Sequence, residues 1–144
     1  MSGEWRDNGN EWQDMEMTTK PRSYKDLLVW QKGLRLVKMV YQETAEFPTE
    51  ERFGLISQMR RCAVSVPSNI AEGQSRRTAG EFVQFISHAE ASLAELETQC
   101  LISIDLGFIT SETAEPILSA IEELQKMLNS LRQKLASRQL ATRP

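Results

Sequence analysis

Residues 58–77 read QMRRCAVSVPSNIAEGQSRR, an apolar helical pattern with an arginine pair near each end and a proline between them. Because Pro67 cannot donate a hydrogen bond to the carbonyl of Ala63 and crowds it, we expect a kink there or a helix that restarts near Ser68. Gly73 and the QSRR that follows are expected to end this helix. Apolar residues recur at helical spacing along two stripes of this helix, as expected in a helix bundle. One stripe consists of Leu55, Met59, Cys62 and Val66, and the other of Phe53, Ile56, Ala63 and Ile70.

An upstream helix, for which Asp26 is the expected N-cap, carries two apolar stripes. The first stripe is expected to face the bundle and consists of Leu27, Trp30, Leu34, Val37 and Tyr41. A four-helix bundle needs about one stripe per helix. We therefore interpret residues of the second stripe, Val29, Leu36 and Val40, as a candidate oligomer interface. The connection to the next helix offers Thr49 as an N-cap.

Two further helices complete the pattern. Thr78 and Glu81 form a capping box at the start of the third helix, and Gly107 is expected just past its end. The fourth helix is expected to open near Thr110, and no segment alternates like a strand. The sequence therefore predicts an all-α fold, an antiparallel up-and-down four-helix bundle with a proline-kinked second helix, over residues 23–137.

The composition fits a single globular domain. The chain has 144 residues, 40% of them hydrophobic, which is enough for a core without metal or disulfide support. No apolar run approaches the ~20 residues of a membrane span, and the polar N-terminus does not resemble a secretory signal. Cys62 and Cys100 lack the spacing of a zinc site and are expected to be reduced, buried thiols. We therefore expect a cytoplasmic protein that makes no membrane contact.

The net charge of −3 is unevenly distributed. Residues 1–22 form an expected acidic tail, and Met17 within it is an alternative start that would remove residues 1–16. Residues 78–125 contain nine acids and no lysine or arginine, whereas residues 138–144 form a basic C-terminal tail. Blocks of opposite sign in a domain that is neutral overall suit self-association between unlike surfaces.

The sequence gives little support for catalysis. His88, the only histidine, is interpreted as a surface residue, and no HxxxE or ExxH pair offers a di-iron carboxylate site. Phosphate-binding glycine motifs are absent from the sequence as well. We therefore predict no catalytic, cofactor-binding or metal-binding residues and no enzymatic activity.

The arginines allow two interpretations. In the first, Arg60 and Arg61 pair with acids of the third helix, within one chain or between subunits. Asn69 and the nearby serines would then satisfy the backbone groups freed by Pro67. In the second, the arginines form a phosphate-binding patch, although no aromatic residues interleave with them to stack on bases. The candidate nucleic-acid or subunit contacts are Arg60, Arg61, Arg76 and Arg77.

Three stretches carry a family resemblance: FGLISQMRRCAVSVPSNIAEGQSRR, EFVQFISHAEASLAELETQ and YKDLLVWQKG. Over roughly residues 23–136 the chain resembles the bacterial four-helix-bundle proteins encoded in intervening sequences of 23S rRNA genes. The resemblance implies an antiparallel bundle assembled as a cyclic homopentamer. It also implies kinship with the accessory variability proteins of diversity-generating retroelements, pentamers that contact a reverse transcriptase and nucleic acid. Those accessory proteins are strongly basic, whereas this chain is acidic overall.

The sequence thus favours a non-enzymatic oligomer that acts as a scaffold or adaptor for a protein partner. The alternative is an accessory factor that binds RNA or DNA, with a reverse transcriptase as a candidate partner. Binding through phosphates would weaken steeply as salt is raised, which separates the two hypotheses.

Overall fold

The computed structural model describes residues 23–141, and within this range it is all helical, as predicted. Four long helices form the bundle: α2 (Leu28–Thr44), α3 (Leu55–Gln74), α4 (Ala79–Asp105) and α5 (Ser111–Ala141). Two short 3-10 turns precede α2 and α3, namely η1 (Tyr24–Asp26) and η2 (Thr49–Glu51). The predicted acidic tail, residues 1–22, lies outside the described residues, and the predicted bundle boundary at residue 137 falls inside α5.

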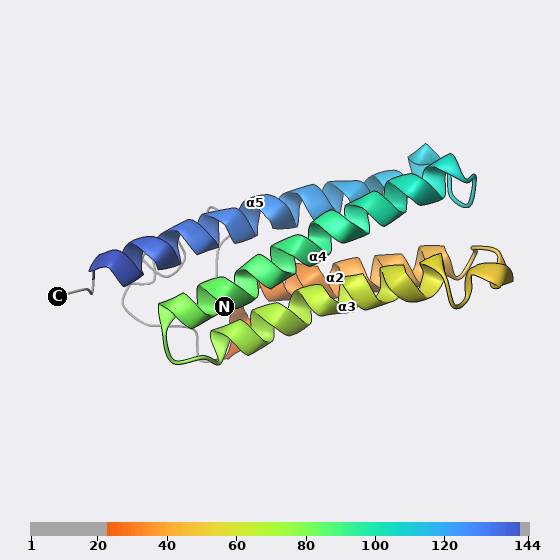
Figure 1. Cartoon of the computed structure of the whole chain (residues 1–144). Coiled ribbons are helices and arrows are strands. Elements are labelled where there is room, and N and C mark those ends of the chain that lie inside the picture. The colour runs from red at the N-terminus through yellow and green to blue at the C-terminus, as the bar shows by residue number, and fades with distance from the viewer. Residues whose placement is uncertain (1–22, 142–144) are drawn as a thin grey trace.

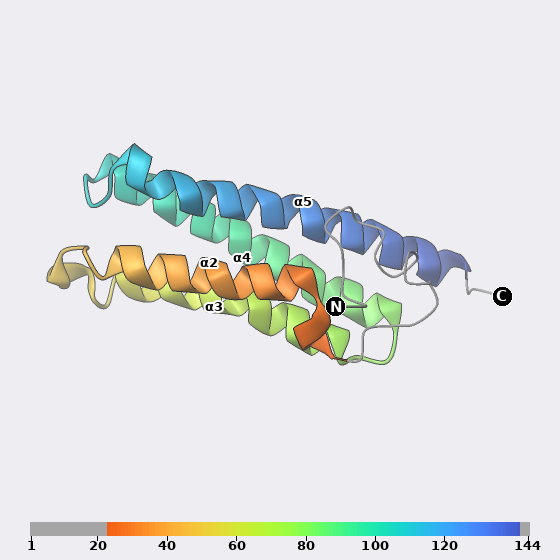
Figure 2. The same ribbon diagram turned by 180° about the vertical axis from the view of Figure 1, so that it is seen from behind.

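The helices run up and down, and each packs against the next one in the chain. Figures 1 and 2 show α2 and α3 on one side of the bundle and α4 and α5 on the other. The bundle closes where α2 packs against α5. All four helices contribute fully buried side chains to one core, with Leu36, Ile70, Leu93 and Ile121 as one example from each.

Signals at the helix ends were predicted well where their partners are close in sequence. The capping box is present: the Glu81 amide donates to Thr78 Oγ1 at 3.1 Å, and the Thr78 amide donates to the Glu81 carboxylate at 3.4 Å. Gly107 follows α4 with φ +79°, the left-handed conformation that glycine adopts without a Cβ clash. Thr110 accepts a hydrogen bond from the Thr113 amide at 3.1 Å, so it opens α5 as expected.

The predicted N-caps of the first two helices were wrong. Asp26 belongs to η1, and α2 begins after Leu27, whose extended backbone and buried side chain set the first turn. Thr49 begins η2 rather than α3. The first amide of α3, that of Leu55, donates instead to the carboxylate of Glu51 at 3.1 Å.

The chain continues as one helix through Pro67, so α3 does not restart near Ser68; a bend of its axis stays a prediction. Pro67 is buried against α2, where a Cβ on Gly33 would lie 3.3 Å from the Pro67 Cβ. Gly33 thereby lets the two helices approach closely. α3 ends at Gln74, within the predicted stretch of Gly73 and QSRR. Gly73 lies in the last turn of α3, where a Cβ would come within 2.7 Å of the Phe85 Cβ of α4.

The predicted role of the second stripe on α2 was wrong, and that of the first stripe was right only in part. Val29, Leu36 and Val40 are buried in the core of a single chain, so they cannot form the predicted oligomer interface. Of the stripe expected to face the bundle, Leu34 and Tyr41 are 45% and 43% exposed. Both stripes are apolar, and the contact between Gly33 and Pro67 turns the second one inward. The exposed apolar surface of α2 therefore belongs to Leu34 and Tyr41, whereas Leu27 is fully buried and Trp30 and Val37 pack against the core.

Candidate functional site

Arg60 joins α3 to the last turn of α2. Its Nε donates to Thr44 Oγ1 at 2.9 Å, and its Nη2 donates to the Tyr41 carbonyl at 3.2 Å. The guanidinium also lies 4.4 Å from the centroid of the Tyr41 ring, within the range of a cation–π contact. A cation is favourable here because the last carbonyls of a helix carry partial negative charge. Arg60 therefore has an architectural role.

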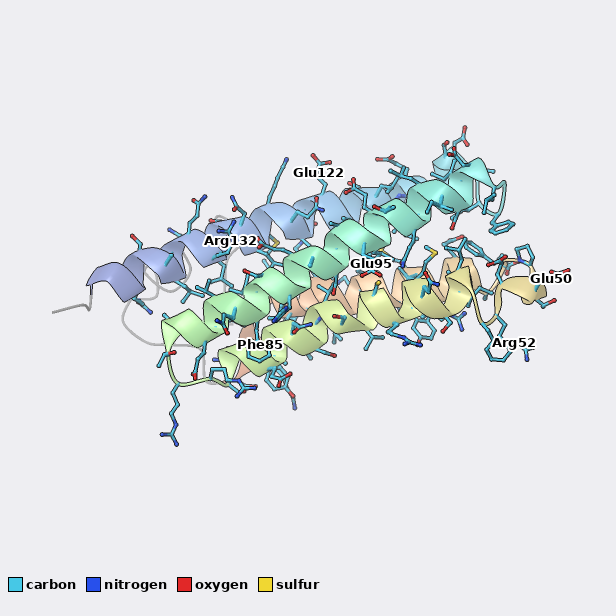
Figure 3. All side chains as sticks on the ribbon, in the orientation of Figure 1. Glu50, Arg52, Phe85, Glu95, Glu122 and Arg132 are labelled. Atoms are coloured by element: carbon cyan, nitrogen blue, oxygen red, sulfur yellow. The ribbon has the colours of Figure 1, made fainter. Side chains whose placement is uncertain are left out.

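Of the other three candidate arginines, one makes contacts within the bundle and two are exposed without an ion pair in the described chain. Arg76 pairs with Glu72 at 2.9 Å, and its guanidinium lies 4.7 Å from the ring centroid of Phe85, which Figure 3 labels on α4. Arg61 and Arg77 are exposed and make no ion pair within residues 23–141. The expected pairing of Arg60 and Arg61 with acids of the third helix is therefore not found within the described chain. Pairing between subunits stays a prediction.

The structure does not bring the arginines into one patch. Arg61 lies near the start of α3 and Arg76 two residues past its end, so roughly 20 Å of helix separates them at a rise of ~1.5 Å per residue. Near the C-terminus, Arg132 pairs with Glu90 at 3.1 Å and also donates to Asn129. Much of the positive charge offered for phosphate binding is thus occupied in contacts between or within helices, which leaves the nucleic-acid hypothesis with less support.

A hydrogen bond between Ser65 and Ser92 joins α3 to α4, and Asn69 bonds Ser65 within α3. Asn69 Nδ2 donates to the Ser65 carbonyl at 2.7 Å and to Ser65 Oγ at 2.9 Å, and Ser65 Oγ lies 2.8 Å from Ser92 Oγ. We expected Asn69 to satisfy the carbonyl freed by Pro67, which is that of Ala63. Asn69 bonds the carbonyl of Ser65 instead, so that part of the prediction was wrong.

An apolar groove, which we call the α2–α3 groove, lies between the outer faces of these helices. Leu34 from α2 and Val64 from α3 are 45% and 40% exposed in it. Lys38 and Arg61 are exposed close to it along their helices and make no ion pair with another described residue. The lining consists of Tyr24, Trp30, Leu34, Val37, Val64, Pro67, Ser68 and Ala71 and contains no acid.

A second groove, which we call the α4–α5 groove, lies between α4 and α5 and is acidic. Its lining is mainly polar but includes two leucines, one of which, Leu101, is 49% exposed. Figure 3 shows Glu122 pointing outward from α5, where its carboxylate lies 3.5 Å from the Lys126 ammonium. The lining consists of Glu97, Leu101, Glu115, Leu118, Ser119, Glu122 and Gln125. The uneven charge of the sequence thus becomes a difference between two sides of the bundle.

The two thiols are both buried, as predicted. Burial raises the pKa of the Cys100 thiol from 9.0 to about 11, with the charge of Glu97 as a smaller cause. Burial also raises the pKa of Cys62, assisted by Glu95. His88 is exposed, with its ring edge-on to Phe85 at 6.0 Å. No group of three or more potential metal ligands occurs among residues 23–141, and no helix in this range could span a membrane.

Native Cys100 is expected to resist thiol reagents until the pH approaches about 11, because only the thiolate attacks. The raised pKa also makes the folded state keep its proton when the unfolded state has lost it. The Cys100 thiol therefore makes its full contribution to stability below about pH 9, and this contribution declines as the pH rises toward 11. Labelling rates measured from pH 7 upward, with Cys62→Ala to isolate Cys100 and urea-unfolded protein as the reference, check this. Rapid labelling of the folded protein at pH 8 would contradict it.

Comparison with known families agrees with the resemblance noted in the sequence. The family model described as 23S rRNA-intervening sequence protein matches residues 25–130, a range that includes α2, α3, α4 and most of α5. The matched range includes Gly33 and Pro67, which lie in close contact where α2 packs against α3. Among curated proteins, none matches the chain.

Proposed function

Because the chain belongs to the 23S rRNA-intervening sequence protein family, we propose that it is a non-enzymatic scaffold that works as a homo-oligomer, a cyclic homopentamer in the cytoplasm. The observation that carries the proposal is the α2–α3 groove, in which Leu34 and Val64 stay substantially exposed on a single chain. Contiguous apolar surface of this kind marks an interaction site in soluble proteins. The number five rests on the resemblance to pentameric proteins.

The use of polar residues also supports a scaffold. Arg60, Arg76 and Arg132, together with the Ser65–Ser92 pair, hold helices in place rather than converge on one cavity. Their contacts stiffen the bundle and leave its long sides as the surfaces available for partners. A rigid body with two unlike sides suits a closed ring of identical subunits.

Light scattering coupled to size exclusion tests the proposal. The native chain is expected to elute at five times its chain mass of 16.4 kDa. Replacing both Leu34 and Val64 with glutamate is expected to reduce the mass to that of one chain, because carboxylates cannot be buried in an apolar contact without partners. Gln84→Glu with Gln133→Glu, at exposed sites outside both grooves, is the matched control and should leave the mass unchanged. A native chain that elutes as a monomer would refute the oligomer.

A further inference from the structure

We propose that the α2–α3 groove of one copy binds the α4–α5 groove of a second copy, so that the subunits associate head to tail. This inference rests on the proposed oligomer and adds to it the two surfaces that meet. Each is lined from two neighbouring helices, and neither is covered within the described chain.

The positions of the grooves allow one copy to use both at once. Since α2 and α3 lie on one side of the bundle and α4 and α5 on the other, the two grooves face away from each other. A subunit can therefore bind one neighbour with each side. A contact of this type is heterologous, which means that it joins different patches and is repeated around a ring.

The chemistry of the two grooves is complementary. Leu34 and Val64 give the α2–α3 groove an apolar centre, and Lys38 and Arg61 add cations without ion pairs in the described chain. The α4–α5 groove also has leucines, Leu101 and Leu118. Its flanking acids are Glu97, Glu115 and Glu122. The leucines of the α4–α5 groove would then meet the apolar lining of the α2–α3 groove, while its acids meet Lys38 and Arg61, and such complementarity is usual at an interface.

Charge disfavours contact between identical grooves of two copies. Two α2–α3 grooves would bring Lys38 and Arg61 close to Lys38 and Arg61 of the second copy. Two α4–α5 grooves would bring Glu97 and Glu115 close to the same acids of the second copy. Like charges across an interface oppose association, so the unlike pair is preferred. The same charges predict that added salt weakens the contact.

The decisive experiment mixes two variants that each lose one groove. The first carries Leu34→Glu and Val64→Glu, and keeps the α4–α5 groove. The second carries Leu101→Lys and Glu115→Lys, at exposed positions, and keeps the α2–α3 groove. Each variant alone is expected to be a monomer by light scattering. Their mixture is expected to form a one-to-one dimer, since a single intact pair of grooves remains and no further subunit can add.

Controls separate this inference from the proposed function. The Gln84→Lys, Gln133→Lys variant matches the second variant in added lysines and should assemble as the native chain does. If the native chain is oligomeric but the mixture stays monomeric, or if either variant still self-associates, the pairing is overturned while the oligomer stands. A monomeric native chain overturns both. If circular dichroism shows that Leu34→Glu lowers the helix content, Lys38→Glu with Ser68→Glu takes its place; Lys38 is exposed beside the groove and Ser68 is exposed in its lining.

Discussion

Replacing Leu36 with glutamate is expected to unfold the protein. Leu36 is 0% exposed and lies in the core shared by all four helices. The substitution removes a buried leucine, which costs about 2–5 kcal/mol, and buries a carboxylate without a partner, which costs more. Domains of this size are stable by about 5–15 kcal/mol in total, so little or no folded protein should be left.

Circular dichroism measures the result directly, as loss of the helical signal at 25 °C or a large fall in Tm. Leu34→Glu is the matched control, because it places the same charge two residues away on a side chain that is 45% exposed. That variant should keep its helix content. If Leu36→Glu stays folded but becomes monomeric, α2 is rotated about its axis relative to the structure, and the interface first predicted from Val29, Leu36 and Val40 is correct.

Replacing Arg60 with methionine is expected to destabilise the fold by about 1–3 kcal/mol, whereas Arg61→Met should change it by less than about 0.5 kcal/mol. Arg60 donates to Thr44 and to the Tyr41 carbonyl, and Thr44 is fully buried. Arg61 is exposed and makes no ion pair with the described residues. Methionine keeps the length and apolar stem of the side chain, so the difference reports the guanidinium.

Urea unfolding of both variants, at a protein concentration low enough to dissociate oligomers, gives this comparison as a shift in midpoint. Equal losses for the two arginines would contradict an architectural role that belongs to Arg60 alone. A larger loss for Arg61→Met would place a structural partner for Arg61 outside residues 23–141.

The sequence predicted the fold class and the helix signals that act over short distances. The capping box and the start of α5 need partners only three residues away, so the local pattern contains all the information. The rotation of α2 was predicted wrongly because both of its stripes are apolar. Its inward face is set by the approach of Gly33 to Pro67, residues from different helices whose contact no local pattern encodes.

For the candidate surfaces too, the sequence predicted local features but not those that depend on contacts between helices. Leu34 and Tyr41 of the first stripe were assigned to the bundle but are exposed. The partners of Arg60 were missed because they lie 16 and 19 residues upstream. The unequal charge of the segments was visible in the sequence. The sequence did not show that these acids gather in one groove, because Glu97 lies on α4 and Glu115 and Glu122 lie on α5.

The order in which the helices pack has a consequence for how the chain folds. Among the four long helices of the described chain, each packs against its successor, and only the contact of α2 with α5 joins two that are not consecutive. Topologies with mostly short-range contacts pay little loop-closure entropy and fold in microseconds to milliseconds. During synthesis, α2 and α3 can close on each other through Gly33 and Pro67 while α5 is still being translated. The newest helix then completes the core by filling the space left between α2 and α4.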